Sequence, residues 1–432
     1  MITEHMRALI KNGVTIRAMF EEGKELARKY GKENVYDFSL GNPNVETPEE
    51  IKNIIGEIIS DENSLSLHGY MSNSGYEDVR KTIANDINRK YHLSLDESSI
   101  VMTCGAAGGL NIILKSILED DDEVILFAPF FGEYSNYIKN FNGKEVVVDT
   151  DERTFFPNIE SLKRSITKRT KAVIINSPNN PTGVIYSGKV IQDICSVLKE
   201  KELEYHKEIY LIADEPYREL VYDDIDVPYI LNYYDNSFVC YSYSKSLSLP
   251  GERIGYVVIN DKMMNFKEVT VALSIANRIL GFVNAPSLFQ KVVKRSLNLE
   301  VDINIYKKNR DLIYSHLTSL GIECEKPKGA FYLFPKCPIE NDKKFCEEAK
   351  RFNILLVPGS VFKKEGYFRL AYCVSYETIV NSLPKFKELA RNLEISIRYM
   401  ADLTTLVDSS RRSVREYLRT EEERKGMLRE AA

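Results

Sequence analysis

The sequence has few of the residues that build metal sites and disulfide frameworks. Only five histidines occur in 432 residues, and their positions are too dispersed to suggest a cluster. The seven cysteines are odd in number and scattered, and no two of them have Cys-x-x-Cys spacing. We therefore expect free thiols in a reducing compartment, with neither a zinc site nor any other bound metal.

Long apolar runs and an excess of positive charge are also missing. The 58 Lys and Arg residues are outnumbered by 63 Asp and Glu residues, so the net charge is −5 and no basic stripe suits nucleic acid. No run approaches the roughly 20 apolar residues that a membrane span needs. Charged residues interrupt the first 20 positions, where a signal peptide would need an apolar core. We expect a cytoplasmic protein that binds neither nucleic acid nor membranes.

The chain is long enough for roughly two to three domain-sized units. From residue 98 on, apolar strand-like runs alternate with helical patterns, and these runs lie at 100–103, 123–128, 171–176 and 209–213. This alternation is typical of an α/β fold with a mostly parallel central sheet and helices on both faces. Ligands of such sheets bind at the carboxyl ends of the strands, which is where the polar clusters described below occur.

The regions that flank this alternation have other patterns. The apolar spacing predicts helices at 15–30 and 48–59. Beyond residue 286 it predicts a smaller α+β domain. Its expected elements are a long helical stretch at 287–320, strands at 330–334, 354–357 and 367–373, and helices at 342–352 and 378–393.

A lysine among hydroxyls stands at the end of the strand-like run 237–243. Lys245 follows Ser242 by three residues, and Arg253 follows eight residues later. A neutral lysine amine condenses with a carbonyl to a Schiff base, and a neighbouring cation lowers its pKa. We interpret Lys245 as the anchor of a cofactor aldehyde, with Ser242 and Arg253 on the cofactor's phosphate. Taken alone, a lysine beside serines is more often a solvated loop residue.

Two further clusters suit such a cofactor. Gly105-Ala106-Ala107 opens a helix, where free N–H groups and the helix dipole attract an anion. Asp214 follows an apolar strand, and a carboxylate there can keep a pyridine nitrogen protonated. Simple close packing of the turn and a helix cap at Asp214 are the competing interpretations.

Three more side chains complete the set. Asn180, within Asn-Asn-Pro-Thr-Gly, and Tyr217 can donate hydrogen bonds to an oxygen on the cofactor ring. Arg369 is a charge inside an apolar strand, and its planar fork suits a carboxylate. Ordinary turn formation at Asn180 and a structural salt bridge at Arg369 are the alternatives.

Five motifs occur in a characteristic order. They are Ser39-Leu40-Gly41-Asn42-Pro43, Ala128-Pro129-Phe130-Phe131-Gly132-Glu133-Tyr134, Ser177-Pro178-Asn179-Asn180-Pro181-Thr182-Gly183, Asp214-Glu215-Pro216-Tyr217 and the stretch from Lys245 to Tyr256. In this order they resemble the class I/II pyridoxal-5′-phosphate (PLP) dependent aminotransferases, the aspartate-aminotransferase-like group of fold type I. The resemblance covers roughly residues 5–390.

The resemblance implies a role for each residue. Lys245 would be the Schiff-base lysine and then the general base and acid of a 1,3-proton shift, while Asp214 would pair with the pyridine nitrogen. Other side chains would contact the ring, the phosphate or the substrate α-carboxylate. These would be Tyr217, Asn180 and Phe131 on the ring; Gly105, Ala106, Ala107, Ser242, Arg253 and Tyr70 of a second subunit on the phosphate; and Arg369, Gly41 and Asn180 on the carboxylate. The phosphate turn lacks the hydroxyl that this family often carries there, so we expect Ser242 and Arg253 to contribute more.

The implied function is ping-pong transfer of an amino group from an L-amino acid to a 2-oxo acid such as 2-oxoglutarate, in a homodimer with shared active sites. A PLP-dependent lyase of the same fold and a non-catalytic PLP-binding regulator are the alternatives. An aspartate-like donor would need a second cation. Arg278 and Arg17 are candidates, and each can also be a surface or structural arginine.

We expect the chain to divide into four segments. Residues 1–45 would form an N-terminal arm and a segment that packs on the small domain. Residues 46–286 would form the large PLP-binding domain, and residues 287–394 the small C-terminal domain. Residues 395–432 would form a helical tail outside the resemblance.

Overall fold

The computed structural model describes residues 2–4, 6, 7, 10 and 15–393, without the side chains of residues 15–18 and 20. The expected tail at 395–432 lies outside the described residues. Within them, no helix is both long and apolar enough to cross a bilayer. The first expected helix is confirmed as α2 (Thr15–Tyr30).

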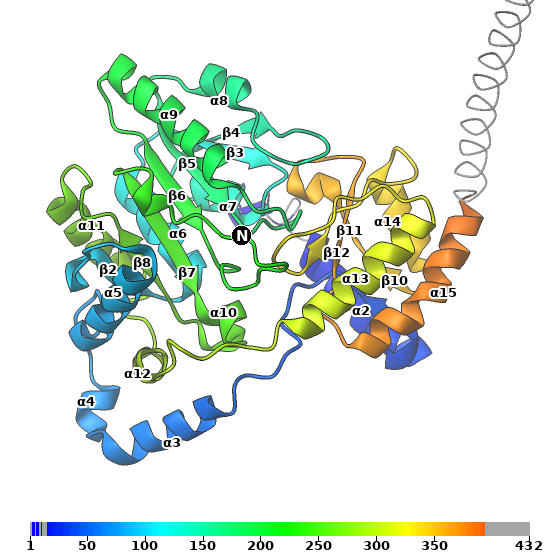
Figure 1. Cartoon of the computed structure of the whole chain (residues 1–432), viewed down its shortest axis with the longest axis horizontal. Coiled ribbons are helices and arrows are strands. Elements are labelled where there is room, and N and C mark those ends of the chain that lie inside the picture. The colour runs from blue at the N-terminus through cyan, green and yellow to red at the C-terminus, as the bar shows by residue number, and fades with distance from the viewer. Residues whose placement is uncertain (1, 5, 8–9, 11–14, 394–432) are drawn as a thin grey trace, which may run out of the picture.

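A seven-stranded sheet forms the centre of the larger part of the molecule (Figure 1), with the strand order β2-β8-β7-β6-β5-β3-β4. The strands are β2 (Ile100–Thr103), β3 (Glu123–Ala128), β4 (Lys144–Asp149), β5 (Thr170–Asn176), β6 (Tyr210–Asp214), β7 (Ser237–Ser242) and β8 (Gly255–Ile259). Only β8 runs antiparallel to its neighbours, β2 and β7. The mostly parallel sheet predicted from the sequence is confirmed.

Alternate residues of the central strands enter two different hydrophobic cores. In β3, Val124 and Leu126 belong to one core, whereas Ile125 and Phe127 belong to the other. Helices cover both of these cores. The first core is covered by α6 (Gly105–Ile117), α7 (Glu133–Lys139) and α11 (Phe266–Ile279). The second is covered by α5 (Glu77–Tyr91), α8 (Ile159–Ser165), α9 (Gly188–Tyr205) and α12 (Ser287–Arg295). Because both faces are buried, these strands are continuous apolar runs rather than alternating ones.

A third, smaller core lies beside the large sheet (Figure 1). It is built on a three-stranded antiparallel sheet with the order β11-β12-β9, and β1 pairs in parallel with β10 nearby. The strands are β1 (Tyr36–Asp37), β9 (Tyr332–Leu333), β10 (Ile354–Leu355), β11 (Val357–Pro358) and β12 (Phe368–Ala371); the helices are α13 (Asn304–Ser319), α14 (Asp342–Lys350) and α15 (Tyr376–Asn392). The β1–β10 pairing joins the N-terminal segment to this smaller core.

Two details differ from the sequence-based expectations. The long helical stretch expected at 287–320 is two helices, α12 and α13, separated by residues 296–303; the Asp302 side chain accepts the Asn304 N–H at the start of the second. The first of them packs on α3 (Glu50–Asp61), α4 (Ser64–His68) and α5, and the second on α15. The structure also adds β4, an edge strand whose polar residues concealed it in the sequence. The domain boundaries at residues 45, 286 and 394 stay a prediction.

Gly255 allows three segments to meet at the carboxyl end of the sheet. It begins β8, where it pairs with Thr103 of β2 and Ser242 of β7. A Cβ atom at this position would collide with the Tyr241 carbonyl oxygen and would lie 3.0 Å from the Gly105 Cα. The absence of a side chain therefore brings the Gly105 turn close to the end of β7.

We predict that Gly255→Ala lowers the free energy of unfolding by about 2 kcal/mol or more, because the added methyl group meets backbone atoms that cannot move away. Gly56→Ala is the matched control. Gly56 lies in α3, and nothing stands within 4 Å of the Cβ that would be added. There the same change should stabilise the protein by about 0.5–1 kcal/mol. Urea denaturation of the cofactor-free proteins measures both, and equal midpoints would contradict the steric argument.

Candidate active site

The polar clusters singled out in the sequence meet in one cavity of about 270 Å³ at the carboxyl ends of the strands. Of the thirteen predicted site residues, all line it except Gly105, which lies just beyond its wall, and Tyr70. The lining residues are Gly41, Ala106, Ala107, Phe131, Asn180, Asp214, Tyr217, Ser242, Lys245, Arg253 and Arg369. The strands that end here bring together side chains from five separate stretches of sequence.

Lys245 lies in the short helix α10 (Tyr243–Ser246), which Ser242 caps through a hydrogen bond to the Ser244 N–H. Its Nζ donates to the Gly41 carbonyl oxygen at 3.1 Å and lies 5.7 Å from the centre of the Phe331 ring. Burial, with a smaller contribution from Arg253 and Arg369, lowers the pKa of this amine to about 8. A substantial fraction of the side chain is therefore neutral and nucleophilic at moderately alkaline pH.

Asp214 ends β6 and is almost fully buried. The Tyr134 hydroxyl donates to its Oδ2 at 2.5 Å, whereas its Oδ1 has no hydrogen-bond partner. Burial raises the pKa of this carboxyl to about 7, and the hydrogen bond from Tyr134 acts in the opposite direction. Asp214 does not cap a helix; its free oxygen needs a donor that the described residues do not supply.

The start of α6 forms a cradle for an anion. Gly105 has a φ of +71°, which glycine adopts without strain. The Arg253 guanidinium lies directly against this turn, since a Cβ on Gly105 would be 3.0 Å from Arg253 Nη2. Ser242 Oγ completes the group and lies 2.7 Å from Ser244 Oγ. Backbone N–H groups, the helix dipole, one cation and hydroxyls thus surround one point.

Arg369 projects from β12 and is only 3% exposed. Its Nη1 donates to Asn180 Oδ1 at 3.1 Å and its Nη2 to the Ser39 carbonyl oxygen, while Nε has no partner. No carboxylate among the described residues lies within ion-pair distance of it, which contradicts the alternative of a structural salt bridge. A buried guanidinium without a counter-ion is costly unless an anionic ligand binds it.

Three contributors to the site were missed in the sequence. Tyr134 lies one turn after Phe131, so its place in the aromatic motif was an available signal. Asn176 ends β5; its side chain donates to the Asp214 carbonyl oxygen and accepts the Asn180 N–H, both at 2.7 Å. Tyr332 comes from the smaller core and places its hydroxyl 2.9 Å from that of Tyr217, a contact that no local pattern indicates.

Two of the arginine and tyrosine candidates, Tyr70 and Arg278, do not reach this cavity. Tyr70 is 95% exposed and lies outside it. Arg278 is on the exposed side of α11, also outside the cavity. The side chain of Arg17 is outside the described residues. Within one chain, therefore, neither Tyr70 nor Arg278 completes the site.

Comparison with known proteins agrees with this geometry. The family model "Aminotransferase class I and II" matches residues 33–383. An aspartate aminotransferase of Pyrococcus abyssi is 28% identical over 383 residues, covering 85% of this chain and 94% of that protein. A probable aspartate/prephenate aminotransferase of Aquifex aeolicus is 30% identical over 368 residues, covering 82% and 91%.

Among solved structures, an aminotransferase from Eubacterium rectale superposes with a TM-score of 0.88 at 42% sequence identity, covering 91% of this chain and 99% of that one. Because the family match spans residues 33–383 and so includes every residue that lines the cavity, the chain belongs to the class I and II aminotransferases.

Proposed function

We propose that this PLP-dependent aminotransferase uses an acidic, aspartate-like L-amino acid as donor and a 2-oxo acid such as 2-oxoglutarate as acceptor, with Lys245, Asp214 and Arg369 at the centre of its active site. The observation that carries the proposal is the buried Arg369 without a counter-ion, which shares one cavity with a lysine of lowered pKa. A substrate carboxylate supplies the missing negative charge.

PLP suits the unsatisfied groups of the cavity. A protonated pyridine nitrogen would donate to Asp214 Oδ1, the buried oxygen that has no partner. The phosphate would take the cradle formed by the Gly105-Ala106-Ala107 turn, Ser242 and Arg253. When bound, PLP supplies an electron sink for negative charge that develops at the substrate Cα. We assign Phe131 to the face of the ring, and Tyr217 and Asn180 to its oxygen.

The roles of the chain's own groups follow from their positions. Lys245 Nζ would take the proton from the substrate Cα and pass it to the carbon of the cofactor that bore the aldehyde, and in the second half-reaction it would move a proton in the reverse direction. Arg369, with Asn180 and the Gly41 backbone, would hold the α-carboxylate and so fix the Cα near that amine. Tyr332 would hold both Tyr217 and Arg369 in position, because its hydroxyl lies 2.9 Å from the Tyr217 hydroxyl and its ring centre lies 4.7 Å from the Arg369 guanidinium.

We further propose a homodimer in which each site is completed by the second copy. Val271, Ile275 and Ile279 form an exposed apolar row at successive turns of α11. A contiguous row of this kind on a surface helix is typical of a protein–protein contact. The row supports a dimer whose partner covers this helix.

Tyr70 and Arg278 are held at the same edge of this surface. The Asn277 side chain, next to Arg278, donates to the Asn73 carbonyl oxygen at 2.8 Å, and Asn73 in turn donates to the Val283 carbonyl oxygen. The segment after Tyr70 is thereby tied to the end of α11. We propose that both side chains enter the partner's cavity, Tyr70 toward the phosphate and Arg278 toward a distal substrate carboxylate.

A donor panel tests the substrate class. With 2-oxoglutarate as acceptor, aspartate should give a higher kcat/KM than alanine or phenylalanine, and Arg278→Ala should lower kcat/KM for aspartate by about 10–100-fold, the value of a charge-assisted hydrogen bond. The same substitution should change kcat/KM little when alanine is the amino donor, because alanine has no distal carboxylate. Arg295→Ala, at another exposed arginine, is the control. Equal losses for both donors would remove the assigned role of Arg278, and keto acid formed without any acceptor would indicate a lyase.

Cofactor uptake should follow the ionisation of Lys245. Because burial lowers its pKa to about 8, the amine is mostly charged below that pH and mostly neutral above it. We predict that the rate of PLP uptake by the cofactor-free protein rises with pH through a midpoint near 8, followed by absorbance. Free Nα-acetyl-lysine is the reference, with an amine pKa of about 10.4. A midpoint that matches the free amine would contradict the effect of burial.

Arg253 and Ser242 should contribute unequally to cofactor retention. The Ser242 hydroxyl already has partners in Ser244, whereas the Arg253 guanidinium lies against the Gly105 turn with one nitrogen donating to the Pro250 carbonyl oxygen. We predict that Arg253→Ala raises the PLP dissociation constant about tenfold more than Ser242→Ala, since a charge-assisted contact to phosphate is lost. Fluorescence titration of the cofactor-free variants measures both constants, and equal values would refute the ranking.

A further inference from the structure

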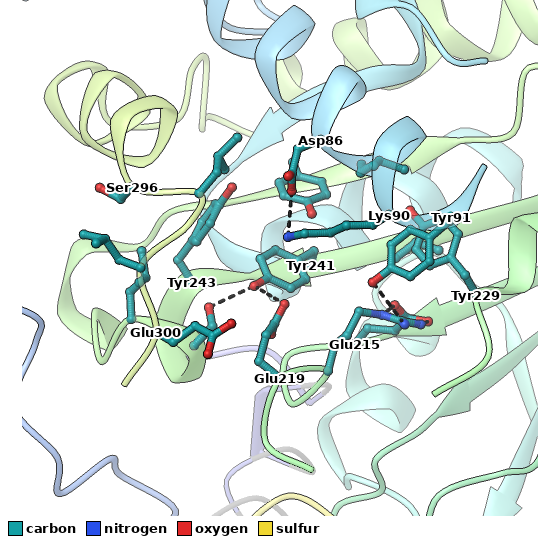
Figure 2. Close-up of a pocket in the computed structure, with 18 residues that line it drawn as sticks. Asp86, Lys90, Tyr91, Glu215, Glu219, Tyr229, Tyr241, Tyr243, Ser296 and Glu300 are labelled. Atoms are coloured by element: carbon teal, nitrogen blue, oxygen red, sulfur yellow. Dashed lines mark hydrogen bonds and ion pairs between the residues drawn. The ribbon is translucent and has the colours of Figure 1, made fainter. Parts of the chain in front are cut away.

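A second cavity of about 60 Å³ lies outside the active site (Figure 2). Its walls come from α5, from the turn after β6, from the end of β7 with α10, and from the segment between α12 and α13. None of the residues assigned to PLP or substrate lines it, although some of its lining residues are sequence neighbours of those residues. The cavity is therefore a separate space.

Tyrosine rings form much of its lining. Tyr241 and Tyr256 are stacked with ring centres 4.8 Å apart, and Tyr243 meets Tyr241 edge-on at 5.1 Å. Tyr229, Tyr243 and Tyr256 are each 8% exposed or less. Their three hydroxyls have no hydrogen-bond partner among the described residues, although the hydroxyl of Tyr241 has two. The three oxygens are not among the fully buried atoms without a partner, so each borders space that water or a polar ligand can occupy.

The cations of the lining are already neutralised within it. The Arg218 guanidinium is paired with Glu215, with its Nη2 2.7 Å from Oε1, and lies 5.2 Å and 4.9 Å from the ring centres of Tyr91 and Tyr229, which stack on each other. Lys90 Nζ lies 2.7 Å from Asp86 Oδ2, the pair joined by a dashed line in Figure 2. Both positive side chains thus have a carboxylate of their own.

Two carboxylates remain without a cation. Glu219 accepts the Tyr241 hydroxyl at 2.8 Å and forms no ion pair with any described residue, and Glu300 has neither a hydrogen bond nor an ion pair there. Figure 2 shows the two side chains approaching the cavity from different segments of the chain. The groups of the lining that pair with no described cation are therefore the carboxyl groups of Glu219 and Glu300, both at exposed residues, and the three phenol oxygens, all of which can accept hydrogen bonds.

We propose that this cavity binds a small organic cation rich in N–H donors, of the alkylguanidinium or alkylammonium class. Such a ligand donates to the Glu219 and Glu300 carboxylates and to the free phenol oxygens. Its positive charge is also attracted by the faces of the tyrosine rings. An anion is disfavoured, since both cations of the lining are already paired and two carboxylates are not.

The cavity shares its wall with the catalytic segments. Tyr241 and Tyr243 flank Ser242, and Glu215 directly follows Asp214, so alternate residues of the same short stretches face the two spaces. A cation bound here contacts the reverse side of the segments that hold the active-site lysine and aspartate, without entering the active site.

The test uses methylguanidinium as the probe and the PLP-loaded protein. This probe stays protonated and does not condense with the cofactor as a primary amine would. Methylurea, which has nearly the same shape and no charge, is the matched control. At low ionic strength, calorimetry should show one saturable site per chain for methylguanidinium, with a dissociation constant of about 1 mM or tighter. Heat without saturation, or equal binding of methylurea, would overturn the proposal.

Charge-removing variants locate the bound probe. Glu219→Gln keeps an acceptor for the Tyr241 hydroxyl, and Glu300→Gln alters a side chain without partners, so at least the second should leave the fold unchanged. Each should weaken methylguanidinium binding about tenfold, the loss of one charge-assisted contact. Glu365→Gln, an exposed carboxylate away from the cavity, should bind the probe as the parent does. Unchanged affinity in both cavity variants would show that the probe binds elsewhere and would refute the site.

Discussion

The structure depends on a buried positive charge that has no counter-ion among the residues that the structure describes. Arg369 lies between the rings of Tyr332 and Phe362, and its guanidinium meets only neutral oxygens. Burying such a charge is unfavourable, and the surrounding fold must supply the compensating stability. Two extensive hydrophobic cores do this by holding β12 and the Asn180 turn rigidly on either side of the site. The unmet charge is then available to an anionic ligand.

Asp214 is a buried acidic group with an unsatisfied atom, as Arg369 is a buried basic one. Its carboxylate is buried with one oxygen hydrogen-bonded by Tyr134 and the other free, and burial raises its pKa to about 7. The Asn176 side chain fixes both the Asp214 backbone and the Asn180 turn. One amide thus links the carboxylate to the residue that orients Arg369. The two unsatisfied groups have a defined relative position before any ligand binds, which reduces the entropy that binding must overcome.

The sequence predicted the parts of this arrangement that are local. The central strands were predicted from their apolar runs, and the turns from the polar residues directly after them. Lys245, Asp214 and Arg369 were singled out by their positions within or just after such runs. It failed where a contact joins distant elements. The meeting of Tyr332 with Tyr217 requires the smaller core to dock against the large sheet, and β4 is stabilised by its pairing with β3 rather than by its own polar residues. The prediction of one helical stretch at 287–320 was wrong, because the chain leaves the helix after Arg295 and begins a new one at Asn304.

Opposite charge patterns on the two sides of the same segments determine what each cavity can accept. The active site carries Lys245, Arg253 and Arg369 against the single carboxylate of Asp214, so phosphate and carboxylate groups are favoured there. Behind it, Glu219 and Glu300 are unpaired while Lys90 and Arg218 are neutralised. Because the residues of a strand alternate between its two sides, one stretch around Ser242 can serve both surfaces. The stretch from Tyr241 to Tyr256 therefore presents Lys245 and Arg253 to the first cavity and phenol rings to the second.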